Sequence, residues 1–243
     1  MYSLFKKEIT SFLSSLSGFV VIIVFLIANG LFLWVFKGNL NIMDNGYATL
    51  ESLFILAPWI FLFLIPAITM RTFAEEKKSR TMELLLSRPL SDMQIVLAKY
   101  FAAMVLILLA ILPTLIYFYS ISRLGSPRGN IDSGGTWGSY AGLLFLAGIY
   151  AAIGIFISSL TENQIVSFII SLLLCFLFYI GFDYLSSLDV FGGFSTFIIK
   201  LGINEHYRSM SRGVLDTRDI LYYISVIFIF LLLTKIKLQS RNW

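Results

Sequence analysis

Six long apolar runs dominate the sequence and restrict what the chain can fold into. A helix needs about 20 mostly apolar residues to cross a hydrocarbon core about 30 Å thick. None of the runs alternates apolar and polar residues with the period of two that a membrane β-strand requires. They predict an all-α integral membrane protein, one domain over residues 1–243 with six transmembrane helices. The runs are Phe19–Phe36, Leu53–Met70, Ile95–Tyr119, Gly138–Ile157, Ile165–Phe182 and Ile220–Ile236.

Composition supports a membrane protein and excludes nucleic acid as a partner. Hydrophobic residues make up 58% of the chain and charged residues 13%, against about 45–50% and about 25% in soluble domains. A surplus of this size is best solvated by lipid, so the bilayer is the first expected partner. No basic stripe with interleaved aromatic residues stands outside the apolar runs, which argues against nucleic-acid binding.

Lysine and arginine gather in the loops on one side of the predicted membrane. Short loops rich in these residues mark the cytoplasmic side. The opposite side has three basic residues in its two shorter loops, and its long loop, 183–219, carries less weight. Both termini and the segment 71–91 are therefore expected in the cytoplasm. The basic residues on that side are Lys6, Lys7, Arg71, Lys77, Lys78, Arg80, Arg88, Lys99, Lys235, Lys237 and Arg241.

Residues 2–16 precede the first apolar run and have a different pattern. Phe5, Ile9 and Phe12 recur at helical spacing, while Lys6 and Lys7 take the other face. This pattern predicts an amphipathic helix lying at the cytoplasmic surface of the membrane. The alternative is a signal peptide, but the apolar run after it is long enough to span and lacks a clear cleavage site.

Residues with catalytic or metal-binding patterns are scarce. The chain has one histidine and one cysteine, no metal-ligand spacing and no Gly-rich loop ending in Lys-Ser or Lys-Thr. We therefore expect no catalytic residue, no cofactor and no metal in this chain, and no enzyme activity of its own. A transport function would need energy from a separate subunit.

The segment 71–91 concentrates charge in an otherwise apolar chain. It contains no glycine, and from Phe73 to Ser87 it is rich in helix-forming residues, which predicts one helix ended by Pro89. Ser91 and Gln94 have the spacing of a capping box that would begin the third span. The segment is either a solvated loop or a rigid element on which another protein docks.

Two stretches resemble ABC-2 type transporter permeases. "EEKKSRTMELLLSRPLSDMQIVLAKY" is similar to the cytoplasmic coupling segment of that family, although Arg80 stands where glycine is common. "EHYRSMSRGVLDTRDILYYIS" is similar to the family's segment before the last span. Among such permeases the resemblance is strongest to that of the gliding-motility ABC transporter of Bacteroidota. The matching residues are Thr81, Glu83, Leu84, Leu85, Pro89, Ser91, Ala98 and Lys99, then His206, Arg212, Gly213, Val214, Leu215, Asp216 and Asp219.

The resemblance implies an exporter subunit in the bacterial inner (cytoplasmic) membrane. A separate ABC ATPase, which would hold ATP and Mg²⁺, would dock on residues 75–88. A second permease or other transmembrane subunit, identical or different, would complete the pathway. The resemblance assigns complementary charge to Glu75, Glu76, Arg80, Glu83 and Arg88, an apolar contact to Leu85, and a role in the same segment to Thr81 and Pro89.

Several alternatives stay open at this stage. The chain could be a membrane scaffold that holds a motility or secretion complex without transporting a substrate. Residues 183–219, with apolar patches at Phe194–Leu201 and Val214–Leu215, could form short extracytoplasmic helices or a surface loop. His206 is expected to be structural rather than a proton or metal site. Small residues spaced by four in the fourth span, such as Gly148 and Ala152, indicate packing within the chain.

Overall fold

The structure, a computed structural model, describes residues 1–86, 89–187 and 195–240. Within these residues the chain is helical, and six stretches are long and apolar enough to cross a membrane. They confirm the six predicted spans. The six stretches are Gly18–Val35, Glu51–Lys78, Asp92–Leu124, Ser133–Leu160, Gln164–Ser186 and Thr217–Gln239.

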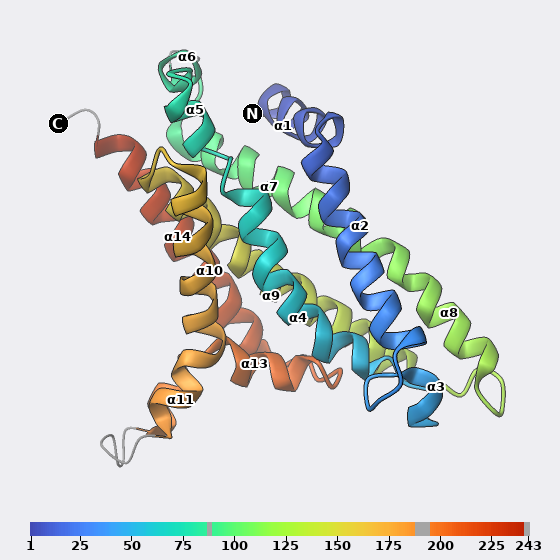
Figure 1. Cartoon of the computed structure of the whole chain (residues 1–243). Helices are drawn as coiled ribbons and strands as arrows, with labels where there is room; N and C mark the ends of the chain where they lie inside the picture. The colour runs from blue at the N-terminus through green and yellow to red at the C-terminus, as the bar shows by residue number, and fades with distance from the viewer. Residues whose placement is uncertain (87–88, 188–194, 241–243) are drawn as a thin grey trace.

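Most of these stretches are longer than the apolar runs that predicted them, because helical hydrogen bonding continues into the polar residues at each end. Several are built from more than one element (Figure 1). The elements, in chain order, are α1 (Tyr2–Ser14), α2 (Leu16–Gly30), the π-helical turn η1 (Leu31–Val35), α3 (Ile42–Asn45), α4 (Glu51–Thr69), α5 (Ala74–Lys78), α6 (Met82–Leu86), α7 (Asp92–Ile111), the 3₁₀ turn η2 (Leu112–Thr114), α8 (Leu115–Leu124), α9 (Ser133–Leu160), α10 (Gln164–Phe176), the π-helical turn η3 (Leu177–Gly181), α11 (Phe182–Ser186), α12 (Ser195–Ile199), α13 (Ile203–Met210) and α14 (Thr217–Gln239).

Helix α9 forms the centre of the bundle. In its most apolar stretch 78% of the residues are buried, against 22% in the corresponding stretches of α2 and α10. Its small residues allow this position, because a Cβ on Gly148 would lie 2.9 Å from the Tyr100 hydroxyl and one on Gly154 would collide with Thr69. The glycines therefore let α4 and α7 approach α9 closely, which confirms packing within the chain.

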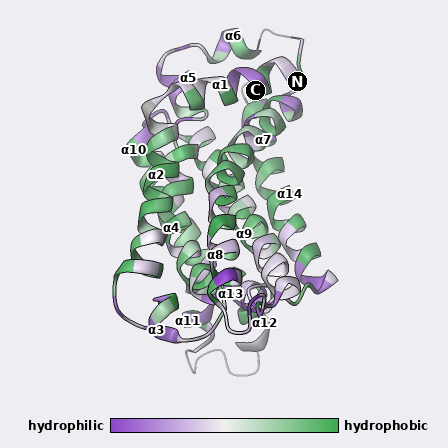
Figure 2. Ribbon diagram, turned by 90° about the vertical axis from the view of Figure 1, so that its right-hand side faces the viewer, coloured by the Kyte–Doolittle hydropathy of each residue, from purple (hydrophilic) through white to green (hydrophobic). Residues whose placement is uncertain are grey.

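The two ends of the bundle have different constructions. Helix α1, the segment 71–91 and the C-terminal end of α14 lie at one end, while α3, α11 and α13 lie at the other (Figure 1). Hydrophobic residues occupy the middle of the long helices and hydrophilic residues collect at both ends (Figure 2). The arrangement places the N-terminus and the end of α14 on the same side of the bundle, as an even number of spans requires.

Helix α1 confirms the amphipathic N-terminal helix, with a shorter C-terminal boundary than the predicted residue 16. It ends at Ser14 because Ser15 has an extended backbone, and the Ser15 hydroxyl accepts a hydrogen bond from the Gly18 N–H as the cap of α2. The capping box of α7 is also confirmed, with the Ser91 hydroxyl accepting from the Gln94 N–H at 3.3 Å.

The prediction of one helix from Phe73 to Ser87 is wrong. The chain forms α5, a turn, and then α6, because Arg80 adopts a left-handed backbone with φ of 56° and no α-helix continues through that conformation. Helix formers along the segment could not reveal this break.

The described parts of the segment 183–219, residues 183–187 and 195–219, contain short helices rather than a single surface loop. Helices α11, α12 and α13 succeed one another here, although residues 188–194 lie outside the described part of the chain. The apolar patch at Phe194–Leu201 contains α12. Val214 and Leu215 form no helix and are 59% and 48% exposed, so the expectation of a helix at that patch is wrong.

Candidate functional site

The charged segment is held against the end of α9 by hydrogen bonds between side chains and backbone groups. The Ser158 hydroxyl, buried at the C-terminal end of α9, accepts hydrogen bonds from the N–H groups of Phe73 at 3.0 Å and Ala74 at 3.1 Å, and donates to the Met70 carbonyl at 2.9 Å. Lys77 Nζ donates to the Ser159 carbonyl in the same turn. A lysine at a helix C-terminus satisfies a carbonyl that has no partner within its helix. The junction between α4 and α5 is therefore fixed to α9.

Lys99 ties three separate elements together at the same end. Its side chain is 1% exposed, and Nζ lies 3.1 Å from Glu8 Oε1 of α1 and 3.0 Å from Glu76 Oε1 of α5. Nζ also donates to the Thr72 carbonyl at 2.8 Å and lies 5.0 Å from the centre of the Phe73 ring. We refer to Lys99, Glu8 and Glu76 as the Lys99 cluster. It joins the N-terminal helix, the charged segment and the third span through one buried cation.

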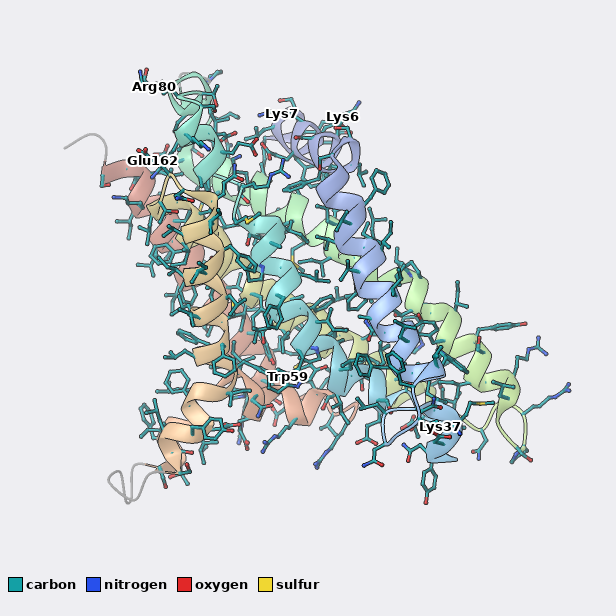
Figure 3. The ribbon with its side chains drawn as sticks, viewed as in Figure 1. Lys6, Lys7, Lys37, Trp59, Arg80 and Glu162 are labelled. Atoms are coloured by element: carbon teal, nitrogen blue, oxygen red, sulfur yellow. The ribbon has the colours of Figure 1, made fainter. Side chains whose placement is uncertain are left out.

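A polar cavity of about 260 Å³ lies beside the Lys99 cluster, between α1 and the charged segment. Lys7 reaches into it, with Nζ 3.7 Å from both Glu8 Oε1 and Glu76 Oε1. Figure 3 shows Lys7 on α1 at the end of the bundle that carries Arg80. Lys7 thus supplies the second positive charge beside the two carboxylates of the cluster.

Arg80 forms the tip of the segment and points away from the bundle (Figure 3). The turn before α6 is closed by the Thr81 N–H, which donates to the Glu76 carbonyl at 2.9 Å. The Thr81 hydroxyl lies 2.8 Å from the Ser79 hydroxyl. Glycine adopts the left-handed conformation at little cost. The positive φ of Arg80 therefore explains why glycine is common at this position in the permease segment.

The residues expected to meet a partner separate into two groups. Glu75, Arg80, Thr81, Glu83 and Pro89 are exposed, and Glu75 also pairs with Arg71 at 3.3 Å. Arg88 lies outside the described residues.

Glu76 and Leu85 face inward instead. Glu76 belongs to the Lys99 cluster with its side chain 14% exposed, and Leu85 is 5% exposed within the apolar core. In this conformation each of these two side chains has its partner inside the chain, so neither presents to the outside the contact that the resemblance assigns to it.

The second set of matching residues lies at the opposite end of the bundle. His206 of α13 bonds through Nδ1 to Asp219 Oδ1 of α14 at 2.7 Å, and through Nε2 to the Lys200 carbonyl at 2.9 Å. Its ring also stacks on Tyr222, with centroids 4.0 Å apart. The carbonyl only accepts, so Nε2 is the donor in that bond. His206 thus joins α13 to the beginning of the last span, the structural role expected for it.

The neighbouring residues shape the turn before α14. Gly213 has φ of 83°. A Cβ on Gly138 of α9 would lie 2.7 Å from the carbonyl oxygen of Gly213, so this turn packs directly on α9. Asp216 caps α14 by accepting from the Arg218 N–H at 2.9 Å. Arg212 is exposed. The two matching stretches lie at opposite ends of the bundle and do not form one site.

The role of Lys99 and Glu8 was not evident from the residue pattern. The sequence places Lys99 among the basic residues of the cytoplasmic side and among those that match the family segment, and it indicates no role for Glu8. The available signal is a charged residue on the apolar side of each helix, since Glu8 lies four residues after the buried Leu4 and Lys99 lies four residues from the buried Ile95 and Ala103. Pairing them requires knowledge that α1 packs on α7.

Among the described residues no group of three histidine, cysteine, aspartate or glutamate side chains could hold a metal ion. A comparison with curated proteins finds no match. The family described as ABC-2 family transporter protein matches residues 2–214, which include α1, the charged segment and the turn at Gly213. The chain therefore belongs to the ABC-2 family of transporter proteins, as a multi-pass permease subunit.

Proposed function

We propose that this permease couples ATP hydrolysis in a separate ABC ATPase subunit to export across the bacterial inner membrane, and that the ATPase docks on the segment 71–91. The observation that carries the proposal is the Lys99 cluster. A protein bound at α5 and α6 would push on Glu76. Glu76 pairs with the buried Lys99 of α7, and the same cation pairs with Glu8 of α1. Movement of the segment would therefore reach α1 and the third span directly.

The surface of the segment fits a docking role. Glu75, Arg80 and Glu83 are exposed within a few residues of one another, a mixed-charge surface that favours orientation and specificity more than affinity. Ser158 and Lys77 hold the base of the segment on α9. A solvated loop needs neither attachment. With the segment in the cytoplasm, both termini would lie there too, which the excess of lysine and arginine at that end favours.

The transport complex would contain a second transmembrane subunit, either another copy or a different permease. ATP and Mg²⁺ would be bound by the ATPase, and this chain would bind neither. The sequence resemblance also supports a link to gliding motility. In that case cells that carry an uncoupled permease should lose spreading on a surface while the protein still inserts in the inner membrane.

The experiment is co-purification of the ATPase with the full-length permease from native membranes in a mild detergent. Glu83→Arg reverses an exposed charge of the segment and should abolish recruitment of the ATPase. Glu205→Arg makes the same change on exposed Glu205 of α13 at the other end of the bundle and should leave recruitment unchanged. If Glu83→Arg inserts and still recruits the ATPase like the wild type, the segment is not the docking site. If the wild type recruits no ATPase in an intact membrane complex, the scaffold function is favoured.

A further inference from the structure

A cavity of about 530 Å³ lies at the end of the bundle away from the termini, between α4, η3, α11 and α13. Its volume falls within the range of about 300–1,000 Å³ that is usual for ligand sites. Figure 3 shows Trp59 in this region, between α4 and the neighbouring α13. The cavity shares no residue with the segment 71–91, so a ligand can bind in it whether or not an ATPase docks on that segment.

The cavity has an apolar part and a polar part. Ile55, Trp59 and Ile180 line the apolar part. Asp183 and Arg208 line the polar part, where Asp183 Oδ2 also accepts a hydrogen bond from the Asn204 amide. A lining divided in this way fits an amphiphile whose polar group and apolar chain point in opposite directions.

The apolar part is built to be rigid. The Trp59 ring contacts Tyr179 at 5.8 Å between centroids and nearly at right angles. Tyr179 is 6% exposed and comes from the π-helical turn η3, a geometry that often marks functional sites in helices. The Tyr207 hydroxyl donates to the Phe54 carbonyl at 2.7 Å and holds α13 on α4. Burial raises the pKa of this phenol, so it remains a donor.

The cavity continues along an exposed stripe of α4. Ile55, Trp59 and Phe63 recur at intervals of four residues and are 51%, 42% and 55% exposed. Trp59 lies eight residues from Glu51, the first residue of α4, which is about 12 Å along the helix axis. An apolar chain can therefore run from the polar part of the cavity toward the middle of the bundle.

The charges in the polar part select the head group. Arg208 Nη2 lies 3.8 Å from Asp183 Oδ2, at the outer limit of an ion pair, and the Arg208 side chain is 63% exposed. The guanidinium can therefore turn to a phosphate, which its planar fork binds through two parallel hydrogen bonds. Asp183 and the 70% exposed Tyr184 ring offer an acceptor and an aromatic face to an ammonium group. One cationic and one anionic side chain together match a zwitterion.

We propose that this cavity binds a zwitterionic phospholipid from the leaflet at that end of the bundle. Arg208 binds the phosphate, Asp183 and Tyr184 receive the ammonium group, and one acyl chain lies on the α4 stripe beside Trp59. The lipid would fix α11 and α13 to α4 on the side where the three elements leave the cavity open.

The test uses Trp59 as the reporter in the full-length protein. The variant Trp34→Phe/Trp137→Phe/Trp243→Phe retains only Trp59 and is placed in lipid nanodiscs. Phosphatidylethanolamine or phosphatidylglycerol with brominated acyl chains then replaces an increasing fraction of the unbrominated lipid. We expect the zwitterionic lipid to quench Trp59 at an about tenfold lower fraction than the anionic lipid, the factor from one charged hydrogen bond between its ammonium group and Asp183, which the anionic lipid lacks. A matched protein that retains only Trp137, 57% exposed on α9 outside the cavity lining, should show no preference.

Two substitutions locate the head group. Asp183→Asn removes the charged acceptor of the ammonium group and should reduce the preference to about one, whereas Glu205→Gln, which neutralises an exposed carboxylate of α13 outside the cavity lining, should preserve it. Arg208→Gln removes the contact to the phosphate and should raise the fraction at which both lipids quench Trp59, whereas Arg212→Gln, on an exposed arginine just after α13, should leave both fractions unchanged. This second pair also tests the site if Asp183→Asn does not insert. Equal quenching of Trp59 by both lipids would mean ordinary boundary lipid and would overturn the proposal. Absence of quenching by either would also overturn it and would indicate a protein, such as a second copy, on this face.

Discussion

Replacement of Lys99 by methionine should destabilise the protein more than any surface change in the same region. Lys99→Met keeps most of the side-chain volume but leaves Glu8 and Glu76 facing each other with no buried cation. Their side chains are 10% and 14% exposed, and the remaining cation, Lys7, lies 3.7 Å away with its side chain 57% exposed. Breaking a buried ion pair by removing one partner costs about 3–5 kcal/mol. For a chain of this length that cost corresponds to a fall in Tm of about 6–20 °C.

The assay is thermal unfolding of the detergent-solubilised protein, monitored by circular dichroism. Lys78→Met, which removes an exposed lysine from helix α5 at the same end of the bundle, is the control and should leave Tm unchanged. The triple variant Lys99→Met/Glu8→Gln/Glu76→Gln removes all three charges and should recover most of the lost stability, because no carboxylate is then buried without a partner. A Tm of Lys99→Met within about 2 °C of the wild type would refute the reasoning.

Two further predictions concern the turn at Arg80 and the contacts of His206, which lie at opposite ends of the bundle. Arg80→Gly should raise Tm by about 2–4 °C, because a left-handed arginine costs about 1–2 kcal/mol and the added freedom of glycine in the unfolded chain offsets only part of that cost. Arg80→Ala should bring no gain in Tm. An equal gain from alanine would exclude the backbone explanation. His206→Ala should speed hydrogen exchange of the α13 amides by loss of the contacts to Asp219 and the Lys200 carbonyl. Arg212→Ala, which changes an exposed residue, should leave that exchange unchanged. If the α13 amides stay protected after loss of the histidine, His206 does not hold α13 on α14.

Local patterns predicted much of the fold because the bilayer restricts the solutions. A spanning segment must satisfy its backbone within itself, so a long apolar run is sufficient to place a helix. The capping box at Ser91 and the amphipathic helix α1 also depend on neighbouring residues alone, and both are confirmed. The family resemblance could likewise be found from residues close together in the sequence, and the match to residues 2–214 confirms it at the level of the family.

The errors arose where a residue's partner is distant in the sequence. The break at Arg80 is a backbone conformation that propensity disfavours. It occurs where Ser158 and Ser159, about 80 residues away, hold the start of the segment on α9. The resemblance assigns Leu85 an apolar contact with a partner, whereas in this conformation the chain's own core buries it. Propensity and charge patterns contain no information about such contacts.

The sequence by itself determined the class of the protein, the number of its spans and the family to which it belongs, because each depends on local composition or on a contiguous motif. Tertiary structure alone decided that Lys99 meets Glu8 and Glu76, and that Asp183 and Arg208 share a cavity with Trp59. The physical reason is that an ion pair or a cavity depends on how helices pack. The small residues of α9 set that packing in three dimensions, and a charge pattern along one helix cannot show which neighbour will face it.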